Sequence, residues 1–353
     1  YNWLSFLEEY NFGGCLADDM GLGKTVQTLA FLQRQKEKKE RTTTLLVLPT
    51  SLVYNWQEEA KKFTPNLVVM IYTGTNRLKR PELFSAADIV ITTYGIVRLD
   101  IEILEKFYFN YVILDESQNI KNPNANISHD VKKLKSRRKL ILTGTPVENT
   151  TLDLWSQMTF VNEGLLGSLN YFKKEFQIPI EKKKDVQKME RLRTLVKPFI
   201  LRRKKSQVAH ELPDKIEKIV YCEMTPEQEK VYEETKSHYR NSILELIEKN
   251  GVGKSSIMIL QGLMKLRQIA NHPKMADEEY EGSSGKLDSF KELLSNAIDG
   301  NHKILVFSQF VKHLTILKQV LEEKKITYAY LDGTTKDRRA EVDKFQNNEE
   351  VKV

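Results

Sequence analysis

The sequence is poor in cysteine and has no long apolar run. Its 353 residues include two cysteines, Cys15 and Cys222, which match neither a metal-ligand spacing nor a disulfide framework. A reducing, intracellular compartment is therefore expected. No apolar stretch approaches the roughly 20 residues that cross a bilayer, so no membrane contact is expected. The sequence also carries no secretory leader pattern. It opens with Tyr1 in an amphipathic pattern over residues 1–10, and this opening indicates a fragment at its start.

Charge is nearly balanced, with a small basic excess. The 55 Lys and Arg residues outnumber the 48 Asp and Glu residues, so the net charge is +7. This excess mildly favours a polyanionic partner without identifying one. The length exceeds what one hydrophobic core usually serves, and two domains are therefore expected.

Short aliphatic runs alternate with stretches of helical periodicity in the first part of the chain. The runs cover residues 44–48, 68–72, 89–92, 111–115 and 140–143. Strands that alternate with helices in this way predict an α/β fold with a parallel, doubly wound sheet. Long charged helical segments follow residue 150, and aliphatic runs return at 304–307 and 328–331. We expect a first domain over 1–205 with a helical insertion near 150–195, and a second over 206–353 that starts with a linker and a helical insertion near 223–275.

Residues 18–25, DDMGLGKT, carry the strongest chemical signal. Gly21 and Gly23 let backbone N–H groups point at phosphate oxygens, and the helical pattern that follows offers its positive end. Lys24 would neutralise β- and γ-phosphate charge, and Thr25 would offer a hydroxyl to Mg²⁺. Asp18 stands where the strict phosphate-loop pattern has Gly. The alternative is a glycine turn that caps a helix, with Lys24 in solvent.

Two further groups follow predicted strands. Asp115 and Glu116 end the run at 111–115, where nucleotide hydrolases place one carboxylate for Mg²⁺ and one for the attacking water. Taken alone, such a pair is commonly a helix cap. Thr143, Gly144 and Thr145 follow the next run, at the strand end where open α/β sheets bind ligands, and could sense the γ-phosphate. A plain turn is the alternative for them.

Four other patterns resemble functional sites. NGVGKS at 250–255 resembles a second phosphate loop, but no apolar strand precedes it, so a break between two helices is expected. The basic cluster at 132–139 is expected on a solvated helix and turn. The run at 202–205 lies near the predicted domain junction, where an interdomain or phosphate role is more credible, whereas Trp56 and Trp155 have the apolar spacing of core residues.

Eight or nine blocks then occur in one order: DDMGLGKT (18–25), LLVLPTSLVYNWQEE (45–59), DIVITTY (88–94), VILDESQNIKN (112–122), LTGTPVEN (142–149), PFILRRKK (198–205), LRQIANHP (266–273), ILVFSQF (304–310) and LDGTT (331–335). This order resembles the Swi/Snf family of double-stranded-DNA translocases in helicase superfamily two, over nearly the whole chain. The resemblance implies two RecA-like P-loop lobes, with ATP between them and DNA across both. The second lobe is expected to be incomplete.

The resemblance also implies roles for individual residues. The implied catalytic residues are Lys24, Asp115, Glu116 and Gln118, where Gln118 stands in the family's usual histidine position. ATP contacts would come from Asp19, Met20, Gly21, Leu22, Gly23, Lys24 and Thr25; Mg²⁺ ligands from Thr25 and Asp115; and coupling from Thr143, Gly144 and Thr145. DNA-backbone contacts would come from Pro49, Thr50, Ser51, Thr92, Thr93, Tyr94, Ser308, Gln309, Gly333 and Thr334.

These implications make a DNA-dependent ATPase with the cofactors ATP and Mg²⁺ the leading hypothesis. Its partners would be double-stranded DNA, bound without sequence preference, and a DNA-bound protein target, and the motor would be monomeric. The family's arginine fingers lie beyond Val353, so weak hydrolysis is expected of this stretch alone. A nucleotide-gated DNA clamp and a strand-separating helicase are the alternatives. The compartment would be cytoplasm or nucleoid in a prokaryote, which the DESQ variant favours, or the nucleus in a eukaryote.

Overall fold

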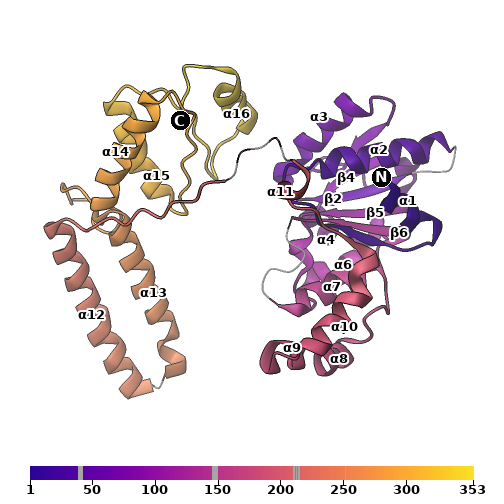
Figure 1. Cartoon of the computed structure of the whole chain (residues 1–353), viewed down its shortest axis with the longest axis horizontal. Coiled ribbons are helices and arrows are strands. Elements are labelled where there is room, and N and C mark those ends of the chain that lie inside the picture. The colour runs from indigo at the N-terminus through magenta and orange to yellow at the C-terminus, as the bar shows by residue number, and fades with distance from the viewer. Residues whose placement is uncertain (39–42, 145–149, 210, 212, 214, 251) are drawn as a thin grey trace. The chain divides into compact units, whose positions relative to one another are not determined.

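The chain forms two compact units. The computed structural model describes residues 1–38, 43–144, 150–209, 211, 213, 215–250 and 252–353. Unit 1 comprises Tyr1–Lys215 and unit 2 comprises Ile216–Val353 (Figure 1). Among the described residues, none of the helices is sufficiently long and apolar to pass through a bilayer.

Unit 1 is built on a seven-stranded sheet with the order β3-β4-β2-β5-β6-β1-β7, in which every pair of neighbours is parallel. The strands are β1 (Gly14–Leu16), β2 (Thr44–Leu48), β3 (Val69–Ile71), β4 (Ile89–Thr93), β5 (Tyr108–Asp115), β6 (Lys135–Leu142) and β7 (Ile200–Leu201). All five residues of β2 and of β4 are buried. Burial on both faces explains why these strands are uniformly apolar in sequence. The α/β prediction is confirmed, and the five predicted strands are present.

Helices cover both faces of the sheet (Figure 1). On one face lie α2 (Lys24–Glu37) and α3 (Val53–Phe63), and on the other lie α4 (Tyr94–Leu99), α6 (Asn126–Lys133) and α7 (Thr151–Val161). Alternate residues of β5 belong to the two cores: Ile113 lies in the same core as Phe31 of α2, whereas Val112 lies in the same core as Met158 of α7. The sheet is therefore enclosed between two apolar layers that leave its strand ends exposed to ligands.

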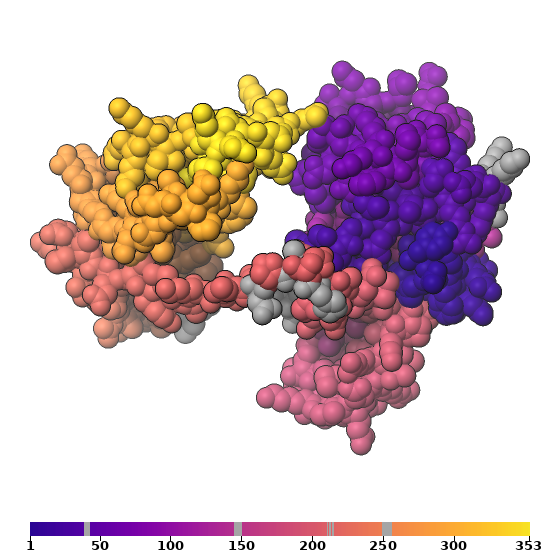
Figure 2. Space-filling model, turned by 45° about the horizontal axis from the view of Figure 1, so that its top comes forward, coloured from indigo at the N-terminus to yellow at the C-terminus, as the bar shows by residue number. Residues whose placement is uncertain are grey.

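The remaining elements of unit 1 are short. They are α1 (Asn2–Glu9), η1 (Thr50–Leu52), η2 (Pro81–Ala86), α5 (Ile101–Leu104), η3 (Ser117–Ile120), α8 (Leu169–Phe172), the π-helical turn Lys173–Gln177, α9 (Ile178–Lys183), α10 (Val186–Val196), η5 (Lys197–Phe199) and α11 (Lys205–Val208). Helices α8–α10 lie together, pink in Figure 2, and overlap the range where a helical insertion was expected. Phe172 and Phe176 anchor this insertion, because both are buried with ring centroids 5.5 Å apart.

The basic cluster at 132–139 differs from its expected place on a solvated turn. Most of it lies on β6, and Arg138 is only 6% exposed. Its guanidinium donates to Glu8 O (2.7 Å) and Asn11 Oδ1 (2.8 Å), so it caps the end of α1. The charge of the cluster favoured an exposed position for Arg138, whereas this arginine is buried and has a structural role.

Unit 2 contains α12 (Pro226–Asn250), α13 (Val252–Asn271), η6 (Pro273–Met275), α14 (Gly285–Asp299), α15 (Val311–Glu323) and α16 (Arg338–Asn347). Gln228 is 1% exposed and joins three helices, since its amide donates to Ile269 O (2.8 Å) and accepts from Gly285 N (3.1 Å). The NGVGKS segment lies where α12 ends and α13 begins, as expected of a helix break, and residue 251 is outside the described residues.

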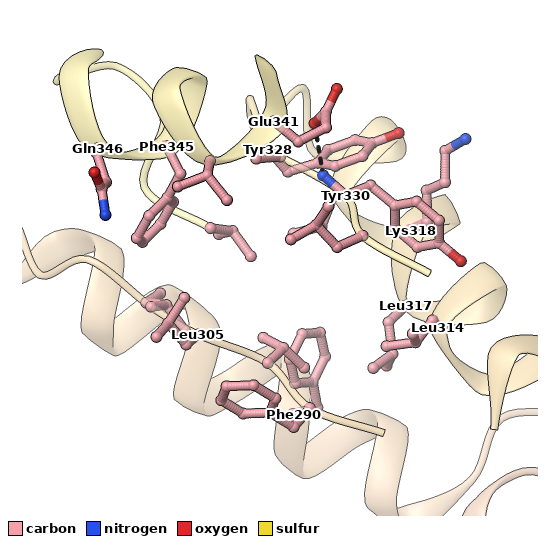
Figure 3. Close-up of a pocket in the computed structure, with 18 residues that line it drawn as sticks. Phe290, Leu305, Leu314, Leu317, Lys318, Tyr328, Tyr330, Glu341, Phe345 and Gln346 are labelled. Atoms are coloured by element: carbon pink, nitrogen blue, oxygen red, sulfur yellow. Dashed lines mark hydrogen bonds between the residues drawn. The ribbon is translucent and has the colours of Figure 1, made fainter. Parts of the chain in front are cut away.

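The runs at 304–307 and 328–331 were predicted as strands, and this prediction is wrong for the described residues of unit 2, which contain no strand. Each run makes a backbone hydrogen bond to the segment 351–353: Ile304 N donates to Lys352 O (2.7 Å) and Ala329 N to Val353 O (3.0 Å). Such isolated bonds do not make a ladder. The runs instead border an apolar pocket of about 380 Å³ into which Phe290, Leu305 and Phe345 point (Figure 3).

A buried carboxylate joins β7 to the loop that follows β1. Asp18 has no exposed surface, and its Oδ1 accepts from Arg203 N (3.0 Å) and Arg203 Nε (3.1 Å). Gln27 Nε2 also donates to Asp18 Oδ2 (3.3 Å). Burial alone would raise the pKa of the Asp18 carboxyl, but the hydrogen bonds from Arg203 and Gln27 and the charge of Arg203 hold the pKa below its usual range.

We predict that Arg203→Ala destabilises unit 1 by about 1.5–3 kcal/mol, because it leaves the buried Asp18 carboxylate without its charged donor. Urea unfolding followed by circular dichroism measures the change. Arg202→Ala removes an exposed neighbouring arginine and serves as the matched control. Equal unfolding midpoints for the two variants would contradict the structural role of Arg203.

The same pair predicts a pH dependence. The folded-state pKa of Asp18 lies below its unfolded value, so its stabilisation is complete above the unfolded pKa of about 4 and disappears as the pH falls through the folded value. The difference in unfolding free energy between wild type and Arg203→Ala should therefore be constant from pH 6 to pH 8 and shrink below about pH 4. A difference that grows on acidification would disagree with this assignment.

Candidate nucleotide site

The loop between β1 and α2 has the conformation that a phosphate cradle requires. Gly21 and Gly23 adopt left-handed φ values of 85° and 74°, and Gly23 is the residue that caps α2. No atom lies within 4 Å of a Cβ built on Gly23, so the requirement for glycine there is conformational rather than steric. The loop thus curls directly onto the positive end of a 14-residue helix.

Lys24 is the first residue of α2, and its side chain folds back over the loop. Its Nζ donates to Asp18 O at 2.7 Å and approaches Asp19 O at 3.5 Å. A phosphate would offer this ammonium a charged acceptor in place of a neutral carbonyl, and such hydrogen bonds are stronger. Lys24 is therefore placed to exchange a backbone partner for a phosphate oxygen.

Asp115 is the last residue of β5 and is only 7% exposed. Trp56 Nε1 donates to its Oδ2 at 2.8 Å, and Glu116 N donates to its Oδ1 at 2.9 Å. Burial raises the pKa of Asp115, although these two hydrogen bonds oppose the rise. A cation in the pocket would favour the charged carboxylate.

Glu116 adopts a left-handed backbone, with φ 50° and ψ 56°. This conformation is uncommon for glutamate, and such strain concentrates at functional sites. Gln118 Nε2 donates to Glu116 Oε2 at 2.8 Å, and Asn119 Nδ2 donates to Glu116 O at 2.8 Å. Gln118 is therefore a direct partner of the second acid.

One pocket of about 500 Å³ brings the loop and both acids together. Its lining includes Gly21, Gly23, Lys24, Thr25, Asp115 and Glu116. No group of three or more His, Cys, Asp and Glu side chains suited to a metal forms among the described residues. A cation here would be held by Thr25 and Asp115 together with phosphate oxygens, which is how Mg²⁺ is bound in nucleotide sites. The residues present fit a magnesium triphosphate.

Helix α3 forms a wall of this pocket that we did not predict from the sequence. Asn55, Trp56, Glu59, Lys62 and Phe63 line it. Their spacing of three and four residues places Trp56, Glu59 and Phe63 on one helix face, and α3 starts at the same sheet edge as α2. This spacing over residues 56–63 was a usable signal, but apolar neighbours indicated a core position alone for Trp56.

Two other groups border the phosphate loop. Thr143 is fully buried, and its N–H donates to Leu16 O at 3.1 Å, which fixes the start of the predicted coupling segment beside β1. Gly144 lies next to Met20, since a Cβ built on it would be 3.4 Å from Met20 Cγ, while Thr145 is outside the described residues. Lys205 N donates to Asp19 Oδ2 at 3.0 Å, so the basic run at 202–205 does reach the phosphate loop.

The predicted DNA contacts of unit 1 fall into two classes. Thr50 and Ser51 are exposed at η1, and Pro49 is half-buried beside them. Thr92, Thr93 and Tyr94 are buried, and each side chain has an internal partner: Thr92 Oγ1 donates to Tyr72 O (2.9 Å), Thr93 Oγ1 accepts from Ile96 N (3.3 Å), and Tyr94 Oη donates to Asp115 O (2.7 Å). In this conformation these three side chains are not available to DNA, because they are buried and hydrogen-bonded within unit 1.

The other four predicted DNA contacts lie in unit 2. Ser308 Oγ accepts from Phe310 N (3.2 Å), and Gln309 Oε1 accepts from Arg267 Nη2 (2.6 Å). Gly333 is exposed, and Thr334 is exposed with its Oγ1 bonded to Asp332 Oδ1 (2.7 Å). Three of the four, Gln309, Gly333 and Thr334, therefore present surface to solvent.

Known proteins resemble this chain over nearly its whole length. The family described as SNF2-related domain matches residues 1–275, and the helicase conserved C-terminal domain matches residues 285–353. A Bacillus subtilis protein named as an ATP-dependent helicase/translocase, YwqA, is 37% identical over 99% of this chain and 39% of its own length. The TATA-binding protein-associated factor MOT1 of Saccharomyces cerevisiae is 31% identical over 99% of this chain and 22% of its own length. The chain thus spans well under half of these relatives.

A solved structure is similar throughout. The Sulfolobus solfataricus SWI2/SNF2 ATPase core in complex with double-stranded DNA is 40% identical, has a TM-score of 0.59, and covers 99% of this chain and 75% of that one. The order of motifs and the parallel sheet of unit 1 agree with these matches. The chain therefore belongs to the Swi/Snf (SNF2-related) family of helicase superfamily two.

Proposed function

We propose that this chain is the core of a motor that hydrolyses ATP and uses the energy to move along double-stranded DNA. The observation that carries the proposal is the meeting of Lys24 with Asp115 and Glu116 in one pocket at the ends of parallel strands. Hydrolysis needs all three, because phosphate charge, cation and water must be placed together. A clamp that only binds nucleotide has no need of the second acid, so the intact pair favours an enzyme.

Each residue of the pocket has a defined task in this proposal. The loop N–H groups around Gly21 and Gly23, together with Lys24, bind the β- and γ-phosphates. Thr25 and Asp115 hold Mg²⁺, which when bound neutralises developing charge on the phosphate oxygens. Glu116 orients and polarises the attacking water, and Gln118 restrains Glu116 through its 2.8 Å hydrogen bond. Thr143 and Gly144 lie against the loop and could register the loss of the γ-phosphate.

Duplex DNA is the proposed track. The Sulfolobus neighbour was solved with double-stranded DNA, and the exposed hydroxyls of Thr50 and Ser51 lie directly before α3, a wall of the nucleotide pocket. Hydroxyls and backbone amides suit phosphate oxygens and carry no base preference. Ser308, Gln309, Gly333 and Thr334 would supply the corresponding contacts of unit 2. We further propose a monomeric motor that displaces or remodels a DNA-bound protein.

We predict that Glu116→Gln lowers the ATPase turnover of the full-length protein about 10²- to 10⁴-fold, because the water loses its general base. Lys24→Ala should abolish turnover by removing the phosphate contact. Phosphate release in saturating duplex DNA measures both. Glu102→Gln, which alters an exposed acid on α5, is the matched control. Wild-type turnover in Glu116→Gln would refute the assignment, and no single-turnover hydrolysis by the wild type would favour a clamp.

A second prediction concerns the track. Replacing Thr50 and Ser51 with Ala should raise the duplex concentration for half-maximal ATPase stimulation roughly 10- to 30-fold, since two hydrogen bonds of about 1 kcal/mol each are lost. ATPase activity without DNA should not change, and the effect should be equal for duplexes of different sequence. Thr194→Ala on α10 is the control. An unchanged half-maximal concentration would remove η1 from the DNA interface.

A further inference from the structure

Asp115 is held by two aromatic side chains from outside its own strand. Trp56 Nε1 donates to the carboxylate (Oδ2, 2.8 Å), and Tyr94 Oη donates to the backbone carbonyl of the same residue (2.7 Å). Both donors are nearly inaccessible, with Trp56 2% and Tyr94 8% exposed. The end of β5 is thus fixed by its side chain and by its main chain at once.

The two donors approach from opposite faces of the sheet. Trp56 belongs to the apolar core with Leu48 and Ala60, and Tyr94 belongs to the core on the other face with Val97. Each ring is therefore immobilised by its own core, and Asp115 lies between two rigid supports. A shift of either helix changes the geometry at Asp115.

Each donor also lies within a few residues of the end of a strand, at one edge of the sheet. Trp56 is the fourth residue of α3, which follows η1 and β2, and Tyr94 is the first residue of α4, immediately after β4. The strands β4, β2 and β5 are neighbours in the sheet. The segment 49–52, which contains η1, and the segment 93–95, where β4 passes into α4, are consequently one helical turn or less from a hydrogen bond to Asp115.

The hydrogen bonds leave Asp115 able to bind a cation. A carboxylate accepts through about four lone-pair sites, and the donors Trp56 Nε1 and Glu116 N use one on each oxygen. With one donor on each oxygen, the plane of the carboxylate is set while a lone pair on each oxygen stays available. Partners of this kind orient metal ligands in other sites.

We infer that Trp56 and Tyr94 are positioning residues for Asp115, and that they transmit displacement of the segments 49–52 and 93–95 to the nucleotide pocket. The positioning role stands on the hydrogen bonds alone. The transmission role rests on the proposed function, in which duplex DNA engages this edge of unit 1. Tyr94, predicted as a DNA contact, then acts beneath the DNA-facing surface.

The test uses Trp56→Phe and Tyr94→Phe in the full-length protein, since each removes one donor and keeps an aromatic ring. Matched controls lose an equivalent buried donor away from Asp115: Trp155→Phe, whose Nε1 donates to Gly167 O (3.1 Å), and Tyr72→Phe, whose Oη donates to Asp100 Oδ2 (2.9 Å). Thermal melting of all four variants reports the purely structural cost.

Electron paramagnetic resonance titration of Mn²⁺ with a non-hydrolysable ATP analogue, without DNA, measures positioning. Trp56→Phe should bind Mn²⁺ about 10- to 100-fold more weakly than wild type, and Tyr94→Phe more weakly to a smaller degree, while both controls bind as wild type does. Wild-type Mn²⁺ affinity in both Trp56→Phe and Tyr94→Phe would overturn the inference. If Trp56→Phe fails to fold, Tyr94→Phe, which loses a single hydroxyl, decides the matter.

The ratio of ATPase rates with and without saturating duplex DNA measures transmission. This ratio should fall in Trp56→Phe and Tyr94→Phe and stay at the wild-type value in both controls. A wild-type ratio in the two test variants would overturn the transmission role. If the wild-type protein itself shows no stimulation, the proposed function fails and transmission with it, whereas the Mn²⁺ titration still decides positioning.

Discussion

The parallel direction of all seven strands is the constraint on which the candidate site depends. It brings the carboxyl ends of β1 and β5 to one edge, although 99 residues separate Leu16 from Asp115. The phosphate loop leaves one of these strands and the two acids leave the other, with only β6 between them. An antiparallel β5 would carry Asp115 and Glu116 to the opposite edge, away from the pocket that they share with Lys24. Burial on both faces then keeps the strands from sliding, because a shift of one residue would exchange the two cores.

Three acidic residues at this edge of the sheet have different surroundings. Asp18, in the place of a motif glycine, is fully buried and bonded to Arg203, so the departure from the pattern serves to attach the segment after β7 to the loop. Asp115 is buried and oriented by donors, whereas Glu116 sits on a strained backbone and is restrained by Gln118. Two adjacent acids thus have different surroundings, which suits one to hold a cation and the other to act on water.

The sequence predicted most of the first unit and less of the second. Runs of five buried residues such as β2 and β4 are visible as apolar stretches, but β1 and β7 have three and two residues, too few to show a pattern. The runs at 304–307 and 328–331 are as apolar as true strands, yet a strand also needs a continuous partner, which composition does not reveal. Trp56 shows the limit most clearly: its spacing predicted the core position it has, while its hydrogen bond to Asp115 depends on a contact 59 residues away.

The central claim is that the loop after β1 and the acids after β5 hold one magnesium nucleotide. A crystal structure of the full-length protein with Mg²⁺ and a non-hydrolysable ATP analogue tests it most directly. In that structure, Lys24 Nζ should leave Asp18 O for the β- and γ-phosphates, and the cation should be bound by Thr25 and Asp115, with Glu116 facing the γ-phosphate. A triphosphate bound elsewhere, with the 2.7 Å bond from Lys24 to Asp18 O intact, would contradict it.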